Sequence, residues 1–463
     1  MKKLSFQQSK YLIERTGLGS ELDLIHFFAD KPIDAAVSQL LSSPISSKVS
    51  KPTLLKPSKM RETKKAFRQS GNRKKANQLY KKERRQLTNW GLQNLLESDN
   101  ALHERMVWFW HNHFTSSIKN VRTADWMLRQ DLSIREHALG NFSDFLKAMS
   151  FDPAMLIYLD GKSNKKGQPN ENFARELLEL FTLGEGHYSE DDIKQAARAF
   201  TGWGVNVKKD KAIYRKKLHD DGVKTFMGKT GKLTGYNILS ILLDNPRTAE
   251  FICEKLWYEF VSIKKPEPAT IKSWAKSFQA SNYNISKLLK TIFTSRAFWD
   301  EKYRGTLIKS PIDLVVGSLR TFDMEDGDLS LFTINKLLKR LGQELYTPPN
   351  VKGWVGGRTW VNDVSLPIRQ RFLQRLLRGQ VGVNKKKKMA DDSGEMMSSG
   401  MAAMNDNTMK KRSKEMSLPK LPSIPERQWM QWLLPIEAVT NIKTKNKRNR
   451  LKALVLDPAY QLK

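Results

Sequence analysis

Apolar residues recur at three- and four-residue spacing along most of this chain, which is typical of helices that bury one face. Leu22, Ile25 and Phe27 show the pattern first, and Gly140 and Gly184 interrupt it further on. Glycine suits the left-handed position that follows many helices, so these two residues mark expected helix ends. The helices that we expect cover residues 58–97, 120–136, 141–149, 169–184, 189–202, 236–299, 309–323 and 333–341.

A weaker two-residue alternation runs between residues 204 and 233, where Val205 and Val207 are followed by Ile213 and Tyr214. Alternation of this kind indicates a small β-hairpin. The whole pattern therefore predicts an all-α fold, with one large multi-helix domain, a Gly/Pro-rich folded segment and one small β-hairpin.

The chain divides into three expected parts. Residues 1–381 form the main helical domain, and its Gly/Pro-rich segment at 346–360 carries two tryptophans that we expect to fold back on the core. Residues 382–423 are rich in Met, Lys and Ser and lack periodicity, which predicts a disordered linker or an insertion. Residues 424–463 are expected to be a C-terminal helical segment that packs back on the main domain.

Positive charge is the strongest compositional feature. The formal net charge is +32, more than solubility requires, and this favours contact with nucleic acid, an acidic glycan, a membrane surface or an acidic protein. Residues 51–90 form a basic helical arm, with 14 Lys and Arg residues against Glu62 and Glu83. Its candidate anion-binding residues are Lys74, Lys75, Arg84 and Arg85. A solvated helix face is the alternative interpretation of such a run.

The composition argues against a disulfide, a cysteine-rich zinc site, a transmembrane helix and a signal peptide. Cys253 is the one cysteine, so a disulfide within the chain and a cysteine-rich zinc site are excluded. The apolar runs are too short for a transmembrane helix. The first ten residues contain three lysines but no apolar core of a signal peptide, so we expect a cytoplasmic protein, with a periplasmic one as the alternative if the start is mis-set.

Polar residues stand among apolar ones in two of the predicted helices. The first, residues 108–114, sets two histidines and an asparagine among four aromatics. The second, residues 169–184, threads four charged residues through an apolar helix: Glu171, Arg175, Glu176 and Glu179. Burying an ionised group without a partner is costly. These residues therefore form either a structural network or a functional site.

An acid–base site is the first of two chemical expectations for this region. Glu176 would act with His111 or His113, and Asn170 and Glu171 would lie beside it.

A divalent metal site is the second expectation. Glu176 and Glu179 share a helix face at three-residue spacing, and His137 and Asp160 would complete the ligand set. The tight Glu-x-x-His pattern of carboxylate–histidine bundles is missing from the chain. His111 and His113 are two residues apart, so they point to different faces and cannot readily chelate one ion together.

A purely structural network is the alternative to both sites. In that interpretation Arg175 and Arg198 pair the glutamates, while the asparagines and histidines cap helix ends. Arg175 is also a candidate contact for a bound anion.

Several motifs in a fixed order resemble those of one known family. These are Phe109–Phe114, Asp152–Leu156, Pro169–Gly184, Ala197–Trp203 and Pro348–Trp354. Together they resemble the bacterial family catalogued as domain of unknown function 1800, over nearly the whole chain except residues 382–423. The resemblance implies a mostly helical fold and no assigned activity. It also implies a partner, because genes of this family often lie beside genes for alkaline-phosphatase-like proteins.

Three functional hypotheses follow from these observations. The first is a helical, metal-dependent or metal-free hydrolase-like enzyme with a His/Asn/Glu-lined site. The second is a non-catalytic accessory or assembly partner of the alkaline-phosphatase-like protein. The third is a protein that binds nucleic acid or another polyanion through residues 51–90. We favour the enzyme, because buried charge in this quantity is expensive to maintain as structure alone.

Overall fold

The computed structural model describes residues 3–44, 48–324, 330–381 and 418–463. It confirms the all-α prediction, since helices α1 to α22 account for most of the described chain and the strands form two small antiparallel sheets. Most of the linker predicted at 382–423 lies outside the described residues.

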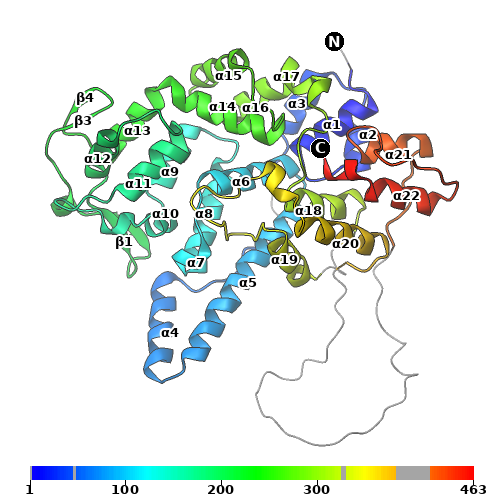
Figure 1. Cartoon of the computed structure of the whole chain (residues 1–463). Helices are drawn as coiled ribbons and strands as arrows, with labels where there is room; N and C mark the ends of the chain where they lie inside the picture. Colours follow the sequence, from blue (N-terminus) through cyan, green and yellow to red (C-terminus); the bar gives the residue numbers. More distant parts are fainter. Residues whose placement is uncertain (1–2, 45–47, 325–329, 382–417) are drawn as a thin grey trace, which may run out of the picture.

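The N-terminal quarter contains three short helices and a projecting helical hairpin. The short helices are α1 (Phe6–Thr16), α2 (Leu22–Phe28) and α3 (Ile33–Leu41). The hairpin consists of α4 (Pro57–Gln69) and α5 (Arg73–Glu97), and its far end extends away from the rest of the molecule (Figure 1). The sequence pattern predicted helical structure over residues 58–97, and two helices are present there.

The central helices carry the aromatic and histidine-rich motifs. They are α6 (Ala101–His113), α7 (Ile118–Val121), α8 (Ala124–His137), α9 (Phe142–Ser150) and α10 (Pro153–Tyr158). Side chains cap several of their first turns, as Asn100 does by accepting a hydrogen bond from the His103 backbone N–H. Such caps satisfy backbone donors that have no partner within the helix.

Helix α11 (Glu171–Glu176) continues into a π-helical turn, Leu177–Thr182, before α12 (Glu190–Ala199). Two hairpins follow where the sequence predicted one. Strand β1 (Trp203–Asn206) pairs with β2 (Lys211–Tyr214), and β3 (Lys224–Phe226) pairs with β4 (Lys229–Gly231). The three-residue strands of the second hairpin are too short to produce a visible alternation in the sequence.

The helices after the hairpins form a layer that ends near the N-terminal helices (Figure 1). They are α13 (Gly235–Asp244), α14 (Pro246–Phe260), α15 (Pro268–Ala280), α16 (Ile285–Thr294) and α17 (Arg296–Trp299). The later helices are α18 (Pro311–Thr321), α19 (Leu331–Arg340), α20 (Ser365–Leu377), α21 (Trp429–Leu433) and α22 (Lys447–Leu456).

One continuous core of buried apolar side chains runs from Leu4 to Tyr460. The C-terminal helices join it, and the Trp432 indole donates a hydrogen bond to the Ser20 carbonyl at 2.7 Å. Within the described residues, every helix is too short or too polar to cross a lipid bilayer.

Candidate functional site

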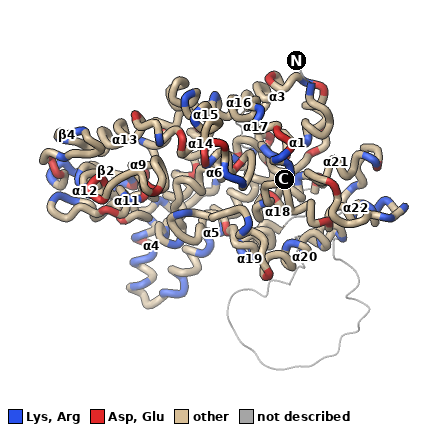
Figure 2. The backbone as a smooth tube through the Cα atoms, turned by 45° about the horizontal axis from the view of Figure 1, so that its top comes forward, with Lys and Arg blue, Asp and Glu red and all other residues tan. Residues whose placement is uncertain are grey.

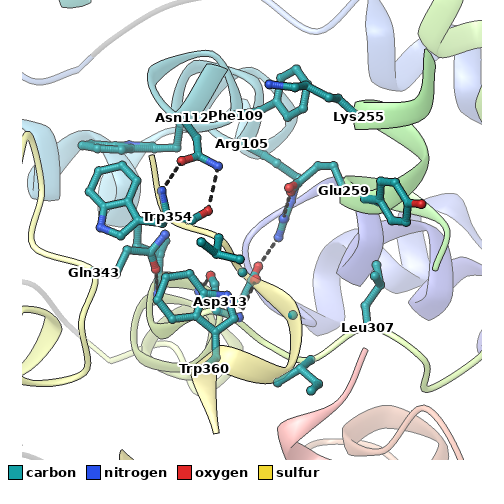
Figure 3. A pocket seen from close by; sticks show the side chains of 18 of the residues that line it. Arg105, Phe109, Asn112, Lys255, Glu259, Leu307, Asp313, Gln343, Trp354 and Trp360 are labelled. Carbon is teal, nitrogen blue, oxygen red and sulfur yellow. Dashed lines mark hydrogen bonds and ion pairs between the residues drawn. The ribbon is translucent and has the colours of Figure 1, made fainter. Parts of the chain in front are cut away.

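A cavity of about 450 Å³ lies between α6, α14 and the Gly/Pro-rich segment. Figure 3 shows Arg105, Phe109 and Asn112 reaching it from α6, with Lys255 and Glu259 coming from α14. The other walls come from the start of α18, the last residue of the chain and the Gly/Pro-rich segment, through Asp313, Lys463, Lys352, Trp354 and Trp360. Ligand sites commonly occupy 300–1,000 Å³, so this cavity is large enough for a small organic molecule.

Asn112 attaches the Gly/Pro-rich segment to α6. Its Oδ1 accepts a hydrogen bond from the Trp354 backbone N–H at 2.6 Å, and its Nδ2 donates to the Trp354 carbonyl at 3.1 Å. Gly353 has φ of 76°, and a Cβ there would overlap the Asn112 amide and lie 2.8 Å from the Asn112 carbonyl oxygen. Glycine is therefore required at residue 353, both for its conformation and for the close approach.

One wall of the cavity is a compensated ion cluster. Arg105 binds Asp313, and its Nη1 is 2.7 Å from a Glu259 carboxylate oxygen. The Lys463 ammonium lies 3.0 Å from the other oxygen of Asp313. These two cations hold the pKa of Asp313 well below its usual value against the opposing effect of burial. The cluster shapes the cavity and leaves little of its charge available for a ligand.

His113 is an uncompensated polar group beside the cavity. It is 2% exposed and lies among Phe109, Trp110 and Phe114. Neither ring nitrogen has a hydrogen-bond partner of good geometry within the described part of the chain, and the backbone of Phe181 offers only a weak hydrogen bond. Burial and the charge of Lys255 hold the pKa of His113 well below its ordinary value. The ring is therefore neutral at physiological pH, with one nitrogen that can accept a proton.

Lys255 is the second uncompensated group. Its ammonium donates to the Leu180 carbonyl at 3.1 Å and lies 4.9 Å from the centre of the Phe251 ring. Leu180 belongs to the π-helical turn, whose last carbonyls have no partner within the helix. Among the described residues no carboxylate is within ion-pair distance of Lys255, and burial lowers its pKa to about 8.

Two tryptophans add to the unsatisfied groups around the cavity. The indole N–H groups of Trp108 and Trp354 are both buried, and neither has an acceptor in the described structure. Buried polar groups are nearly always paired in folded proteins, so these two indole N–H groups are free to donate to a molecule bound in the cavity.

The π-helical turn connects the polar helix of the sequence motif to this cavity. Glu179 lies 3.3 Å from the ammonium of Lys352, a cavity residue, and accepts a hydrogen bond from the Tyr188 hydroxyl at 3.1 Å. Phe181, two residues later, packs against His113 with ring centres 5.9 Å apart. π-Helical turns are frequent at functional sites, and this one borders the two uncompensated groups.

His111 does not share the environment of His113. Its Nε2 lies 2.8 Å from Asp131, which also accepts from Arg135 Nε at 2.5 Å and from the Tyr346 hydroxyl at 2.9 Å. These donors lower the pKa of Asp131 to about 2 although burial acts in the opposite direction. Asp131 is therefore an ionised and well-partnered centre that joins α6, α8 and the Gly/Pro-rich segment. His111 serves in this network as one of its partners.

The other predicted acid–base residues are more dispersed. Glu176 is partly exposed, and burial together with the neighbouring Glu179 raises its pKa. Asn170 caps α11 by accepting from the Asn172 backbone N–H. Glu171 lies 3.4 Å from Arg175, which forms a closer pair with Glu190 at 2.8 Å. Arg175 therefore pairs with glutamates, as the structural alternative anticipated.

Arg198, the second arginine of that alternative, pairs with a different residue. It binds Asp220 at 2.8 Å rather than a glutamate.

The residues proposed as metal ligands lie in separate surroundings. His137 donates through Nδ1–H to the Ser133 carbonyl and stacks on Phe145. Asp160 is exposed and adopts a left-handed conformation with φ of 56°. Across the described ranges, no three His, Cys, Asp or Glu side chains converge as metal ligands. Glu176, Glu179, His137 and Asp160 therefore do not form such a group.

The four anion-binding residues proposed on the arm fall into two classes. Lys74, Lys75 and Arg85 are exposed on α5. Arg84 is partly buried, and its guanidinium lies 2.7 Å from Glu344 and 3.2 Å from the Thr347 hydroxyl. Arg84 therefore attaches the arm to the body and is not part of the exposed face.

Lys255 was missed by the sequence analysis, although a signal for it exists. It follows Phe251 by one helical turn in a run that is otherwise mostly apolar. In the sequence, a lysine in such a run looks like a charge on the solvated edge of a helix. Only the packing of α6 and the π-helical turn against α14 shows that no carboxylate accompanies it. Trp108 and Trp354 look like ordinary core residues in the sequence for the same reason.

Comparison with known proteins supports the family resemblance. No curated protein and no solved structure matches the chain. A family model described as "Protein of unknown function (DUF1800)" matches residues 11–462. The match covers nearly the whole chain, from the first helix to the residue before the last, and includes every motif around the cavity. This protein therefore belongs to the DUF1800 family.

Proposed function

We propose that the cavity between α6, α14 and the Gly/Pro-rich segment binds a small anionic organic molecule, and that the protein acts on it as a hydrolase-type enzyme. One observation carries the proposal. Lys255 has no acidic partner among the described residues, and the indole N–H groups of Trp108 and Trp354 around the same cavity are buried without an acceptor in the described structure. Such groups are costly in isolation, and a ligand bound in the cavity would satisfy them.

The charges and rings of the cavity define the class of ligand. Arg105 and Lys463 are already balanced by Asp313 and Glu259, whereas the ammonium of Lys255 is not balanced. A carboxylate or phosphate would supply the missing negative charge, and its oxygens accept the hydrogen bonds that a cation donates. The aromatic side chains of the wall favour a flat or apolar portion on the same molecule.

His113 and Lys255 are the groups best suited to move a proton. A neutral imidazole accepts a proton from an attacking water, although its lowered pKa makes His113 a weaker base than an ordinary histidine. An ammonium with a pKa of about 8 donates a proton readily to a leaving group near neutral pH. In this proposal the acid–base role expected of Glu176 with His111 or His113 belongs to His113 with Lys255. Glu179 holds Lys352 and the π-helical turn in place.

Turnover of two chromogenic esters tests the proposal. 4-Nitrophenyl succinate carries an anionic acyl group, and 4-nitrophenyl butyrate is a neutral ester of similar size. We expect the anionic ester to be preferred, and His113→Phe to lower its turnover about 100-fold, the usual contribution of a general base. Phenylalanine suits the aromatic surroundings of residue 113, so the variant should fold.

The matched control is His26→Ala, because His26 is exposed on α2. Equal turnover of the two esters, or unchanged turnover in His113→Phe, would contradict the proposal. Binding of the anionic ester without turnover would retain the binding site and reject the enzyme.

A further inference from the structure

Two basic segments that are 150 residues apart in the sequence lie against each other. The Ser58 backbone N–H donates to Asp210 Oδ1 at 2.8 Å, and the Ser58 hydroxyl donates to Oδ2 at 3.0 Å. Arg129 donates to the Asp210 carbonyl at 2.9 Å. Asp210 is in the turn of the β1–β2 hairpin, and Ser58 is in the first turn of α4. The tip of the hairpin is therefore fixed to the base of the arm.

The turn of this hairpin is itself basic. Lys208, Lys209 and Lys211 are exposed and surround Asp210, which is the turn's one acidic residue. Because the Asp210 carboxylate is occupied by Ser58, it is poorly placed to neutralise them, and none of the three lysines forms an ion pair with a described residue.

The arm presents rows of cations next to this turn. Exposed cations recur at helical spacing on both helices, and within the described chain they lack acidic partners: Arg61, Lys65 and Arg68 on α4, and Lys74, Lys81 and Arg85 on α5. Figure 2 shows the resulting predominance of positive charge along α4 and α5. The two helices pack against each other as one hairpin, so both rows of cations belong to the same projecting part of the molecule.

The aromatic residues of the arm are occupied internally. The Tyr80 hydroxyl donates to the Ile118 carbonyl at 2.9 Å, and Lys64 lies over the Tyr80 ring at 5.0 Å. Phe67 is also partly buried. Recognition of single strands usually relies on exposed rings that stack on bases. This face has cations without free rings, which suits contact with the phosphates of a duplex.

We infer that the arm and the β1–β2 turn together form a binding surface for double-stranded nucleic acid, contacted through its phosphates without regard to sequence. The surface is separate from the cavity, and neither proposal depends on the other. Its affinity falls as salt rises, because each phosphate contact releases a condensed counterion.

Fluorescence anisotropy with a labelled 20-base-pair DNA duplex tests this inference on the full chain. The variants are Lys74→Gln with Lys75→Gln on the arm, and Lys208→Gln, Lys209→Gln and Lys211→Gln on the turn. The control replaces Lys272, Lys276 and Lys287, which are exposed on α15 and α16, by glutamine. We expect Kd to rise at least tenfold in both variants at 100 mM salt, and less than twofold in the control.

Asp210→Ala distinguishes binding to a surface of defined geometry from attraction by the net charge of the protein. It makes the protein more positive by one charge, so attraction by net charge alone predicts tighter binding. Loss of the Ser58 contact releases the turn, and we expect Kd to rise about threefold instead. Tighter binding by Asp210→Ala, equal effects of the turn and control variants, or binding of heparin in preference to the duplex would each overturn the inference.

Discussion

Asn112 holds Trp354 by both polar atoms of its amide, one accepting from the Trp354 backbone N–H and the other donating to its carbonyl. The two residues are 242 positions apart, so this pair joins an early helix to a late irregular segment. Both residues line the cavity. The cavity therefore exists because two distant sequence motifs are hydrogen-bonded to each other, and changes at this contact should affect stability and ligand binding together.

Asn112→Ala should lower the free energy of unfolding by about 1–3 kcal/mol, because it leaves a backbone donor and acceptor of Trp354 without partners. Urea denaturation measures the effect. Asn77→Ala is the matched control, since Asn77 is exposed in the interior of α5, and it should change stability by less than about 0.5 kcal/mol. Equal stability of the two variants would show that the Asn112–Trp354 contact contributes nothing.

Comparing Gly353→Ala with Gly167→Ala tests the close packing of residue 353, because the two sites differ in the space available for a Cβ. Both glycines have left-handed conformations, with φ of 76° and 81°. A Cβ at residue 167 meets no atom within 4 Å, whereas one at residue 353 meets the Asn112 side chain and backbone. Both variants incur the conformational cost, and Gly353→Ala should lose about 1–3 kcal/mol more through overpacking. A loss no larger than that of Gly167→Ala would contradict the close packing of the two segments.

Asp131→Asn tests the ionised centre of the core. Removing this charge leaves Arg135 without its nearest counter-ion and disturbs the bonds to His111 and Tyr346. Breaking a buried pair on one side typically costs about 3–5 kcal/mol. We expect a loss of this size in urea unfolding, against little change for Asp191→Asn, an exposed aspartate of α12. A small loss would mean that Asp131 is protonated or solvated in the folded protein.

Asp152 makes stability depend on pH in a defined direction. Burial raises its pKa from the ordinary value of an aspartate to about 7, even though Gln130 and the Met155 N–H donate to it. Between pH 4 and 7 the folded state then binds more protons than the unfolded state, so this group lowers stability as pH rises. Asparagine keeps the cap without the charge.

The free energy of unfolding of Asp152→Asn relative to wild type should therefore be higher at pH 8 than at pH 4.5. Asp144→Asn, at an exposed aspartate of α9, provides the control and should show no such increase. If the free energy of unfolding of Asp152→Asn relative to wild type stays constant or falls as pH rises, the raised pKa of Asp152 is contradicted.

The fold class was predictable because helical periodicity is local. Leu22, Ile25 and Phe27 show it within six residues, and the caps at Ser189 and Asn100 involve residues three positions apart. The second hairpin, β3–β4, was not predictable, since three-residue strands carry too little alternation. The position of the Gly/Pro-rich segment depends on Asn112 and Asp131, which no local pattern connects to residues 346–354.

The candidate site was only partly predictable for the same reason. His113 was identified from its aromatic surroundings, but His111, two residues away, was not distinguishable from it, because the difference comes from Asp131 on another helix. Lys255 stands out because no described carboxylate lies within ion-pair distance of it. That property depends on the packed structure and has no local signal in the sequence. Glu176 and Glu179 drew attention as charges in an apolar helix, yet Glu179 pairs with Lys352 across the fold.

Binding of benzoate and its neutral counterpart benzamide, measured by ligand-observed NMR titration, tests the central claim most directly. We expect benzoate to bind at least tenfold more tightly than benzamide at pH 7, and its affinity to fall by pH 9.5, because Lys255 loses its proton as pH rises through its pKa of about 8. Lys255→Met should abolish this preference, whereas Lys272→Met, at an exposed lysine of α15, should retain it. Equal binding of benzoate and benzamide by the wild-type protein, or an undiminished preference in Lys255→Met, would contradict the assignment of this cavity as an anion site.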